Sequence, residues 1–175
     1  MENKLKIKNS IYALIWVAAL ILLDQITKVL AILKLKDQAP FVIMDGVFEL
    51  RYLENRGAAF GIFQNQLTFF IIMTVVITAF MIYFYWITPC TKKYLPLKVC
   101  MILLVAGALG NCIDRMFRGF VVDFFYFSLI DFPIFNVADI FVTVTFVLFL
   151  ILLFFYYKDE DFLIYSRKHR KEQGK

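Results

Sequence analysis

Aspartates are the residues of this sequence best suited to carry out chemistry, because several of them lie inside or beside strongly apolar segments. Two carboxyl groups that share one site cannot both ionise, so one keeps its proton and the pair can activate water and polarise a carbonyl group. Asp139 is the best placed member of such a pair. For its partner, the spacing favours Asp123, which has two apolar residues on either side, only slightly over Asp114. Asp24 and Asp131 complete the set, and Asp131, which is followed by Phe-Pro, is expected in an exposed turn.

The sequence lacks the side chains that nucleophilic and metal-dependent hydrolysis need. Its single histidine, His169, lies in the basic C-terminal tail, so no serine or cysteine of the apolar segments has a usable imidazole partner. Cys90, Cys100 and Cys112 form no Cys-x-x-Cys pair, and no His-Glu-x-x-His motif is present. Serine, cysteine and zinc-dependent hydrolysis are therefore excluded, and we expect neither a metal ion nor a cofactor.

The composition is that of a membrane protein. Of the 175 residues, 62% are hydrophobic and only 19% are charged, whereas roughly 45–50% of an ordinary soluble domain is apolar. A soluble enzyme and a disordered chain are therefore excluded. The formal net charge is +5, but the basic residues are concentrated in the two tails and one short connection. That pattern indicates membrane topology rather than a nucleic-acid partner.

Four apolar stretches are long enough to cross a hydrocarbon layer of about 30 Å, which requires about 20 residues each. They cover residues 11–33, 67–87, 97–117 and 136–157. No small-x-small cleavage site follows the first stretch, so we interpret it as a retained helix rather than a signal peptide. Lysines and arginines cluster in the N-terminal tail, the second connection and the C-terminal tail, which predicts that both termini are cytoplasmic. We therefore expect an all-α membrane protein with four transmembrane helices, in which residues 1–175 form a single domain.

The first external connection carries secondary structure of its own. In residues 41–55, apolar and polar residues alternate on both sides of Asp45-Gly46, a two-residue turn signal. This pattern predicts a small extracytoplasmic β-hairpin or cradle at the membrane surface. The small and apolar segment 57–63 is expected to dip toward the bilayer before the second helix.

Polar groups in three of the four predicted helices fall at one depth. An ionisable side chain at the bilayer centre costs about 2.5–3.5 kcal/mol on insertion scales, so each one needs a reason. The polar residues are Asp24, Thr27 and Lys28 in the first helix, Asn111, Asp114 and Arg115 in the third, where Gly107 and Gly110 share their face, and Asn136, Asp139 and Thr143 in the fourth. With a rise of about 1.5 Å per residue, all three groups lie near the outer leaflet. Unrelated structural features would scatter through the bilayer, so we predict a polar pocket in that leaflet.

Each group also has a purely structural interpretation. Asp24 and Lys28 are one helical turn apart and can form an ion pair, with Lys28 snorkelling outward. The glycines of the third helix suit a close contact between helices, and Asp114 suits an ion pair with the adjacent Arg115. Asn136 can cap the fourth helix, but capping leaves the neighbouring carboxylate unexplained.

Five motifs occur in order along nearly the whole chain. They are Asp-Gln-Ile-Thr-Lys at 24–28, Glu-Asn-Arg-Gly-Ala-Ala-Phe at 54–60, Gly-Ala-Leu-Gly-Asn-Cys-Ile-Asp-Arg at 107–115, Val-Asp-Phe at 122–124 and Phe-Asn-Val-Ala-Asp at 135–139. Together they resemble the bacterial lipoprotein signal peptidases, also called signal peptidase II. The resemblance implies a four-helix intramembrane aspartic peptidase of the bacterial inner membrane, whose catalytic pair is Asp123 and Asp139.

The resemblance also implies a substrate and a set of supporting residues. The substrate is a prolipoprotein whose lipobox cysteine already carries a diacylglyceryl thioether, and cleavage occurs N-terminal to that cysteine. The residues that match the family and are expected to hold the peptide or orient the pair are Asn55, Asn111, Arg115 and Asn136, while Asp24 and Lys28 buttress the pocket or meet the lipid headgroup. The implied partners are lipid-modified prolipoproteins and membrane phospholipid, with the enzyme acting as a monomer.

Two functions from other classes compete with this interpretation. Buried aspartates also serve transporters and proton-conducting channels. A conduit needs polar residues along its length, whereas the cytoplasmic halves of the predicted helices are almost entirely Leu, Ile, Val and Phe. A purely structural membrane subunit leaves the concentration of Asn and Asp in one layer unexplained. The intramembrane peptidase is therefore the preferred interpretation.

Overall fold

The computed structural model describes residues 2–57 and 66–165. Within these ranges, four helices are long and apolar enough to cross a membrane: α1 (Glu2–Leu35), α2 (Leu67–Ile87), α3 (Leu95–Arg118) and α4 (Val137–Ile151), which continues as a π-helical turn over Leu152–Tyr156. The predicted membrane architecture is confirmed. A short helix, α5 (Asp159–Phe162), follows. The predicted dip of residues 57–63 toward the bilayer lies, apart from Gly57, outside the described residues.

α1 is longer than its apolar stretch, because the helix begins at Glu2 rather than near residue 11. Lysine has a high helix propensity, so Lys4, Lys6 and Lys8 extend the helix beyond the part that predicts a membrane span. α3 begins just before Pro96, which is tolerated there because the first N–H groups of a helix have no helical partner to lose.

α3 is the central helix and packs against α1, α2 and α4. Two of its glycines permit close approach. A Cβ atom on Gly107 would lie 2.6 Å from the carbonyl oxygen of Ala138 in α4, and one on Gly110 would lie 2.7 Å from Asp24 Oδ2 in α1. The small-residue contact expected from the sequence is therefore present, and it brings α1 and α4 close to α3.

Three strands form an antiparallel sheet in the order β1–β2–β3. β1 (Phe41–Met44) and β2 (Phe48–Asn55) form the predicted hairpin, and Gly46 adopts a φ of +65° in its turn, which glycine does at little cost. The sequence pattern does not predict β3 (Val121–Tyr126), which pairs with β2 and is buried over its first four residues. The sheet therefore joins a local hairpin to one distant strand.

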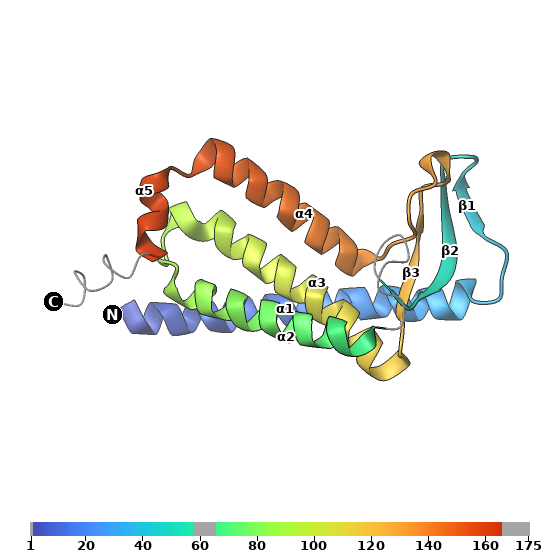
Figure 1. Ribbon diagram of the computed structural model, residues 1–175, viewed down its shortest axis with the longest axis horizontal. Helices are drawn as coiled ribbons and strands as arrows, with labels where there is room; N and C mark the ends of the chain where they lie inside the picture. The colour runs from blue at the N-terminus through green and yellow to red at the C-terminus, as the bar shows by residue number, and fades with distance from the viewer. Residues whose placement is uncertain (1, 58–65, 166–175) are drawn as a thin grey trace.

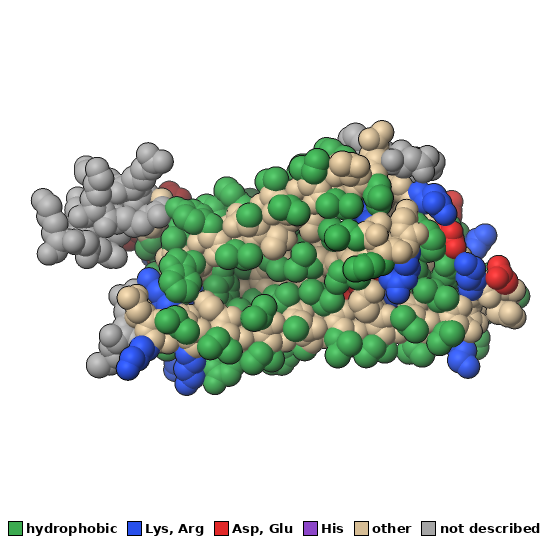
Figure 2. All heavy atoms as spheres, turned by 90° about the horizontal axis from the view of Figure 1, so that it is seen from below, with side chains coloured by type: hydrophobic (Ala, Val, Ile, Leu, Met, Phe, Trp, Pro, Cys, Tyr) green, Lys and Arg blue, Asp and Glu red, His purple; other side chains and the backbone are tan. Residues whose placement is uncertain are grey.

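The helices run side by side, with the sheet at one end and with α5 and the first turn of α1 at the other (Figure 1). Many large apolar side chains on the helices are exposed, for example Leu14 (69%), Phe80 (57%) and Phe146 (62%). Figure 2 shows such side chains along the helical surface, with charged side chains gathered toward the two ends. A continuous apolar surface of this kind is suited to a hydrocarbon layer rather than to water.

Candidate active site

Asp123 and Asp139 reach one site from two different elements. Asp123 is buried in the middle of β3, and Asp139 lies in the first turn of α4. The chain returns between these elements through a bridge in which Phe125 N–H donates to the carbonyl oxygen of Phe135 (2.8 Å) and Phe135 N–H donates to that of Phe125 (3.0 Å). This bridge makes α4 begin beside β3.

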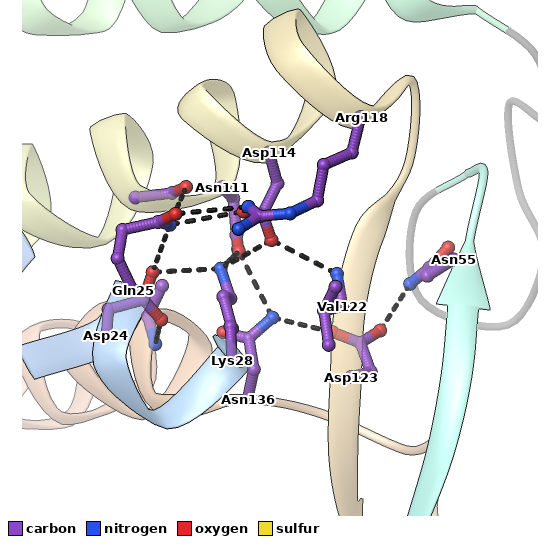
Figure 3. A network of polar contacts seen from close by, with 12 residues as sticks. Asp24, Gln25, Lys28, Asn55, Asn111, Asp114, Arg118, Val122, Asp123 and Asn136 are labelled. Carbon is purple, nitrogen blue, oxygen red and sulfur yellow. Dashed lines mark hydrogen bonds and ion pairs between the residues drawn. The ribbon is translucent and has the colours of Figure 1, made fainter. Parts of the chain in front are cut away.

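Asn136 connects the two carboxylates. Its side-chain oxygen accepts a hydrogen bond from the backbone N–H of Asp139 (3.1 Å), and its own backbone N–H donates to Asp139 Oδ2 (3.0 Å). The two residues thus form a reciprocal capping box at the start of α4. The side-chain nitrogen of Asn136 then donates to Asp123 Oδ1 (2.6 Å). Helix capping therefore accounts for only part of the contacts of Asn136, because its side-chain nitrogen also orients Asp123 (Figure 3).

Two further amide side chains each donate to one of the carboxylates. Asn55 Nδ2, at the end of β2, donates to Asp123 Oδ2 (2.8 Å), and Asn111 Nδ2, from α3, donates to Asp139 Oδ1 (2.8 Å). Asn111 Oδ1 accepts in turn from Asn136 Nδ2 (3.1 Å). Each of the four carboxylate oxygens therefore accepts a hydrogen bond from a neutral donor. These bonds fix the orientation of both side chains without placing a cation directly on either.

Lys28 is fully buried behind Asn111. Its Nζ lies 2.9 Å from Asp24 Oδ2 and 3.1 Å from Asp114 Oδ2, and it donates to Asn111 Oδ1 (2.8 Å). The expected ion pair with Asp24 is present, but the expectation that Lys28 snorkels outward is wrong. An ammonium group has three donor hydrogens, and three interior acceptors satisfy them. Figure 3 shows the side chain pointing into this cluster.

The expectation that Asp114 pairs with the adjacent Arg115 is also wrong. Asp114 forms ion pairs with Lys28 and Arg118, and its Oδ2 accepts a hydrogen bond from the backbone N–H of Val122 (3.1 Å). Adjacent residues of a helix do not face each other, whereas residues four apart do, which favours Arg118. Asp114 therefore attaches the beginning of β3 to the buried charges of α1 and α3.

Gln25 and Arg118 belong to this buried network although the sequence interpretation did not single them out. Gln25 Nε2 donates to Asp24 Oδ2 and to Asp114 Oδ1 (both 3.1 Å), and Arg118 Nη1 donates to Gln25 Oε1 (3.1 Å). The available signals were the position of Gln25 beside Asp24 and the four-residue spacing of Arg118 from Asp114. The network contains two acids, Asp24 and Asp114, and two bases, Lys28 and Arg118. Because these charges balance, the network supports the site without adding net charge to it.

A cleft of about 550 Å³ lies beside the two aspartates. Its polar lining consists of Asn55, Asn111, Arg115, Asp123, Asp139 and Thr143, and its apolar lining includes Phe70, Phe132, Ile140 and Val144. Arg115 Nη2 donates to the carbonyl oxygen of Gly57 (3.0 Å), and its guanidinium carbon lies 4.2 Å from the centroid of the Phe70 ring. The cleft therefore combines two carboxylates, amide donors and a guanidinium group with a hydrophobic wall.

Burial and the negative charge of Asp139 together raise the pKa of Asp123 to about 7. Hydrogen bonds from Asn55 and Asn136 act in the opposite direction but are weaker. Near neutral pH the site therefore retains a proton, and one carboxyl group can accept a proton while the other donates a hydrogen bond. Within residues 2–57 and 66–165, no group of three or more His, Cys, Asp or Glu side chains is arranged to hold a metal ion.

Comparison with known proteins gives the family. A family model described as Signal peptidase (SPase) II matches residues 16–155. The lipoprotein signal peptidase of Clostridioides difficile (strain 630) is 43% identical over 134 residues, which cover 77% of this chain and 88% of the relative. That of Streptococcus thermophilus (strain CNRZ 1066) is 41% identical over 145 residues, which cover 83% and 92%. A bacterial membrane enzyme solved by the in meso method at 2.3 Å resolution has a TM-score of 0.72 and 35% identity, covering 81% of this chain and 87% of that one. Because these matches span most of the chain, including every element that contributes to the cleft, the chain belongs to the signal peptidase II family.

Proposed function

We propose that this chain is an aspartic endopeptidase that removes signal peptides from diacylglyceryl-modified bacterial prolipoproteins, cleaving N-terminal to the lipidated cysteine. The observation that carries the proposal is the position of Asn136, which binds Asp139 through a capping box and Asp123 through its side chain beside one cleft. Relatives named lipoprotein signal peptidase support the substrate class.

In the proposed reaction, a water molecule lies between the two carboxyl groups and the scissile peptide bond. The deprotonated carboxylate accepts a proton from the water, and the protonated carboxyl group donates a hydrogen bond to the carbonyl oxygen. The water oxygen bonds to the carbonyl carbon, and a tetrahedral diol forms. When the C–N bond breaks, the amine of the lipidated cysteine takes a proton from the carboxyl pair, and the signal peptide leaves with a new carboxyl terminus. No covalent enzyme intermediate is needed.

The other residues in and behind the cleft have separate proposed roles. Asn55, Asn111 and Asn136 hold the two carboxyl groups in orientation, since their side chains or backbone donate to all four carboxylate oxygens. Arg115 binds carbonyl groups of the substrate backbone, because a guanidinium group has five donor hydrogens and only one described hydrogen bond, to Gly57, uses them. Lys28 holds Asn111 in place by donating a hydrogen bond to it, and Asp24 holds Lys28 through an ion pair.

The hydrophobic wall of the cleft is the proposed place for the acyl chains of the substrate. Phe132, Ile140 and Val144 form part of this wall, and both α4 residues are exposed on the surface that faces lipid in a membrane protein. With both termini in the cytoplasm, the sheet end and the cleft face the outer leaflet of the inner membrane, where the lipid-modified precursor is anchored. A monomer suffices, because every residue with a proposed role comes from one chain.

Cleavage of a purified prolipoprotein tests this function. The protein in detergent is incubated with diacylglyceryl-modified precursor, and the products are identified by mass spectrometry. The expected products are the free signal peptide and a protein that begins with the lipidated cysteine. Unmodified precursor should be cleaved far more slowly, because the lipid supplies remote binding energy that positions the scissile bond. Equal rates for the two precursors would remove the lipid from the mechanism, and failure to cleave the modified precursor would contradict the peptidase.

A further inference from the structure

A second groove lies away from the cleft, in the half of the molecule that contains the beginning of α1. It has a volume of about 570 Å³ and runs between α1 and α2, which both pack on α3. Its lining includes Ala13 and Val17 of α1, Ile82 and Trp86 of α2, and Met101 and Val105 of α3. Figure 2 views the molecule from the side of α1 and α2, where basic side chains gather toward both ends, one of which is the end where α1 begins.

Two lysines lie one helical turn beyond the groove, on the helix faces that line it. In α1, Lys6 precedes the groove-lining Ser10 by four residues. In α3, Lys98 precedes the groove-lining Met101 by three residues and Ile102 by four. Residues at these spacings share one face of a helix. Two helices therefore place a cation at the same mouth of the groove.

Lys98 is a buried cation with weak partners. Its side chain is only 5% exposed, and among residues 2–57 and 66–165 no carboxylate forms an ion pair with it. Its Nζ lies 3.3 Å from Cys90 Sγ and 4.5 Å from the centroid of the Tyr85 ring, and Tyr85 itself lines the groove. A thiol and an aromatic ring compensate a desolvated ammonium group poorly. A phosphate at the mouth of the groove would supply the missing negative charge.

The size and rim of the groove favour a lipid chain over a protein helix. Its volume of about 570 Å³ falls within the range of about 300–1,000 Å³ that is typical of sites for small molecules. Tyr83 and Trp86 are about half exposed where they line the groove. Tyr and Trp concentrate at the depth of lipid headgroups. These side chains therefore mark the mouth of the groove as the headgroup level of one leaflet.

We propose that this groove binds one anionic phospholipid, with an acyl chain between α1 and α2 and its phosphate group near Lys6 and Lys98. The bound lipid fills the space between two helices that both rest on α3, and it supplies a counter-charge to Lys98. The site is separate from the cleft beside Asp123 and Asp139, so its occupancy does not depend on which substrate the protein cleaves.

Tryptophan quenching by brominated lipid tests the site. The sequence has two tryptophans: Trp86 lines the groove, whereas Trp16 lies on an open face of α1 with 61% of its side chain exposed. The single-tryptophan proteins W16F and W86F are reconstituted in phosphatidylcholine vesicles that contain a small fraction of brominated phosphatidylglycerol or of brominated phosphatidylcholine. Brominated phosphatidylglycerol should quench Trp86 more strongly than brominated phosphatidylcholine does. Trp16 should be quenched equally by both.

Substitutions in the W16F protein test separately the charge of the lysines and the shape of the groove. Lys6→Gln and Lys98→Gln should each reduce the preference for the anionic lipid about fivefold. Lys8→Gln is the matched control, because Lys8 projects over the ring of Tyr12 rather than toward the groove, and it should change nothing. Ala13→Leu, which fills the groove without altering charge, should reduce the quenching of Trp86 by both lipids.

Two results would overturn the proposal. One is equal quenching of Trp86 by the two brominated lipids in the W16F protein, since this removes recognition of the headgroup. The other is protection of Trp86 from both lipids while Trp16 is quenched normally, since this places a protein segment in the groove.

Discussion

Asn136 Nδ2 lies 2.6 Å from Asp123 Oδ1, at the point where β3 meets the beginning of α4. The same asparagine forms a reciprocal capping box with Asp139. A local interaction that commonly starts a helix therefore also sets the position of one proposed catalytic carboxyl group relative to the other. Because Asn136 caps the start of α4, any shift of that helix start moves both aspartates at once.

The rate of cleavage should decrease as the pH rises through about 7. Burial and the charge of Asp139 raise the pKa of Asp123 to about 7, and above that pH the pair loses the proton that it shares. The measurement is kcat/KM for lipid-modified precursor against pH. A rate that stays constant across neutral and mildly alkaline pH would contradict the proposed protonation state.

The same raised pKa predicts how stability depends on pH. Between about pH 4 and about pH 7, the folded protein binds more protons at Asp123 than the unfolded chain does, so the free energy of unfolding decreases as the pH rises across that window. The melting temperature of the native protein should therefore fall relative to that of Asp123→Asn as the pH increases. Parallel melting curves of the two proteins would exclude this linkage.

Asp114→Asn should act mainly on folding. Loss of this carboxylate leaves Lys28 and Arg118 in a network with a single acid, and breaking a buried ion pair costs about 3–5 kcal/mol. The expected result is a lower yield and melting temperature. Asp131→Asn is the matched control, because Asp131 is exposed in a turn and accepts a hydrogen bond only from Tyr126 among the described residues. An Asp114→Asn protein as stable as this control would show that the network does not hold the fold.

The topology should place the two ends of the molecule on opposite sides of the membrane. A reporter fused after Lys175 or inserted at Lys93 should be cytoplasmic, and one inserted near Gln38, on the side of the sheet, should be external. Lys93 lies next to α5, at the end of the molecule away from the sheet (Figure 1). An external C-terminus would put Asp139 in the wrong leaflet for the proposed substrate.

Features that depend on local sequence could be predicted. The hairpin follows from its Asp45-Gly46 turn, and the cap of α4 follows from Asn136. The common depth of the polar groups also follows from helix length alone, and it brings Asp24, Asn111 and Asp139 into one network. Each of these features needs only spacing along one segment and the thickness of a bilayer.

Features that depend on distant partners could not be predicted. β3 is apolar without alternation because it is buried, and a short buried strand cannot be told from other apolar segments by periodicity. Its pairing partner, β2, is far away in the sequence. Lys28 turns inward because Asp114, from another helix, lies 3.1 Å away. Arg118 takes the place expected for Arg115 because helix geometry favours the four-residue spacing.

Cleavage of lipid-modified precursor by Asp123→Asn, Asp139→Asn and the double variant tests the central claim most directly. The variants are compared at equal amounts of folded protein, with thermal unfolding measured in parallel. Each single variant should fold normally and lose turnover, and the double variant should be little worse than either, because residues that act as one unit fail together. If Asp123→Asn kept near-normal cleavage while well-folded Asp114→Asn had none, the pair would be Asp114 and Asp139. If all of these variants cleaved the precursor, the aspartic mechanism would be contradicted.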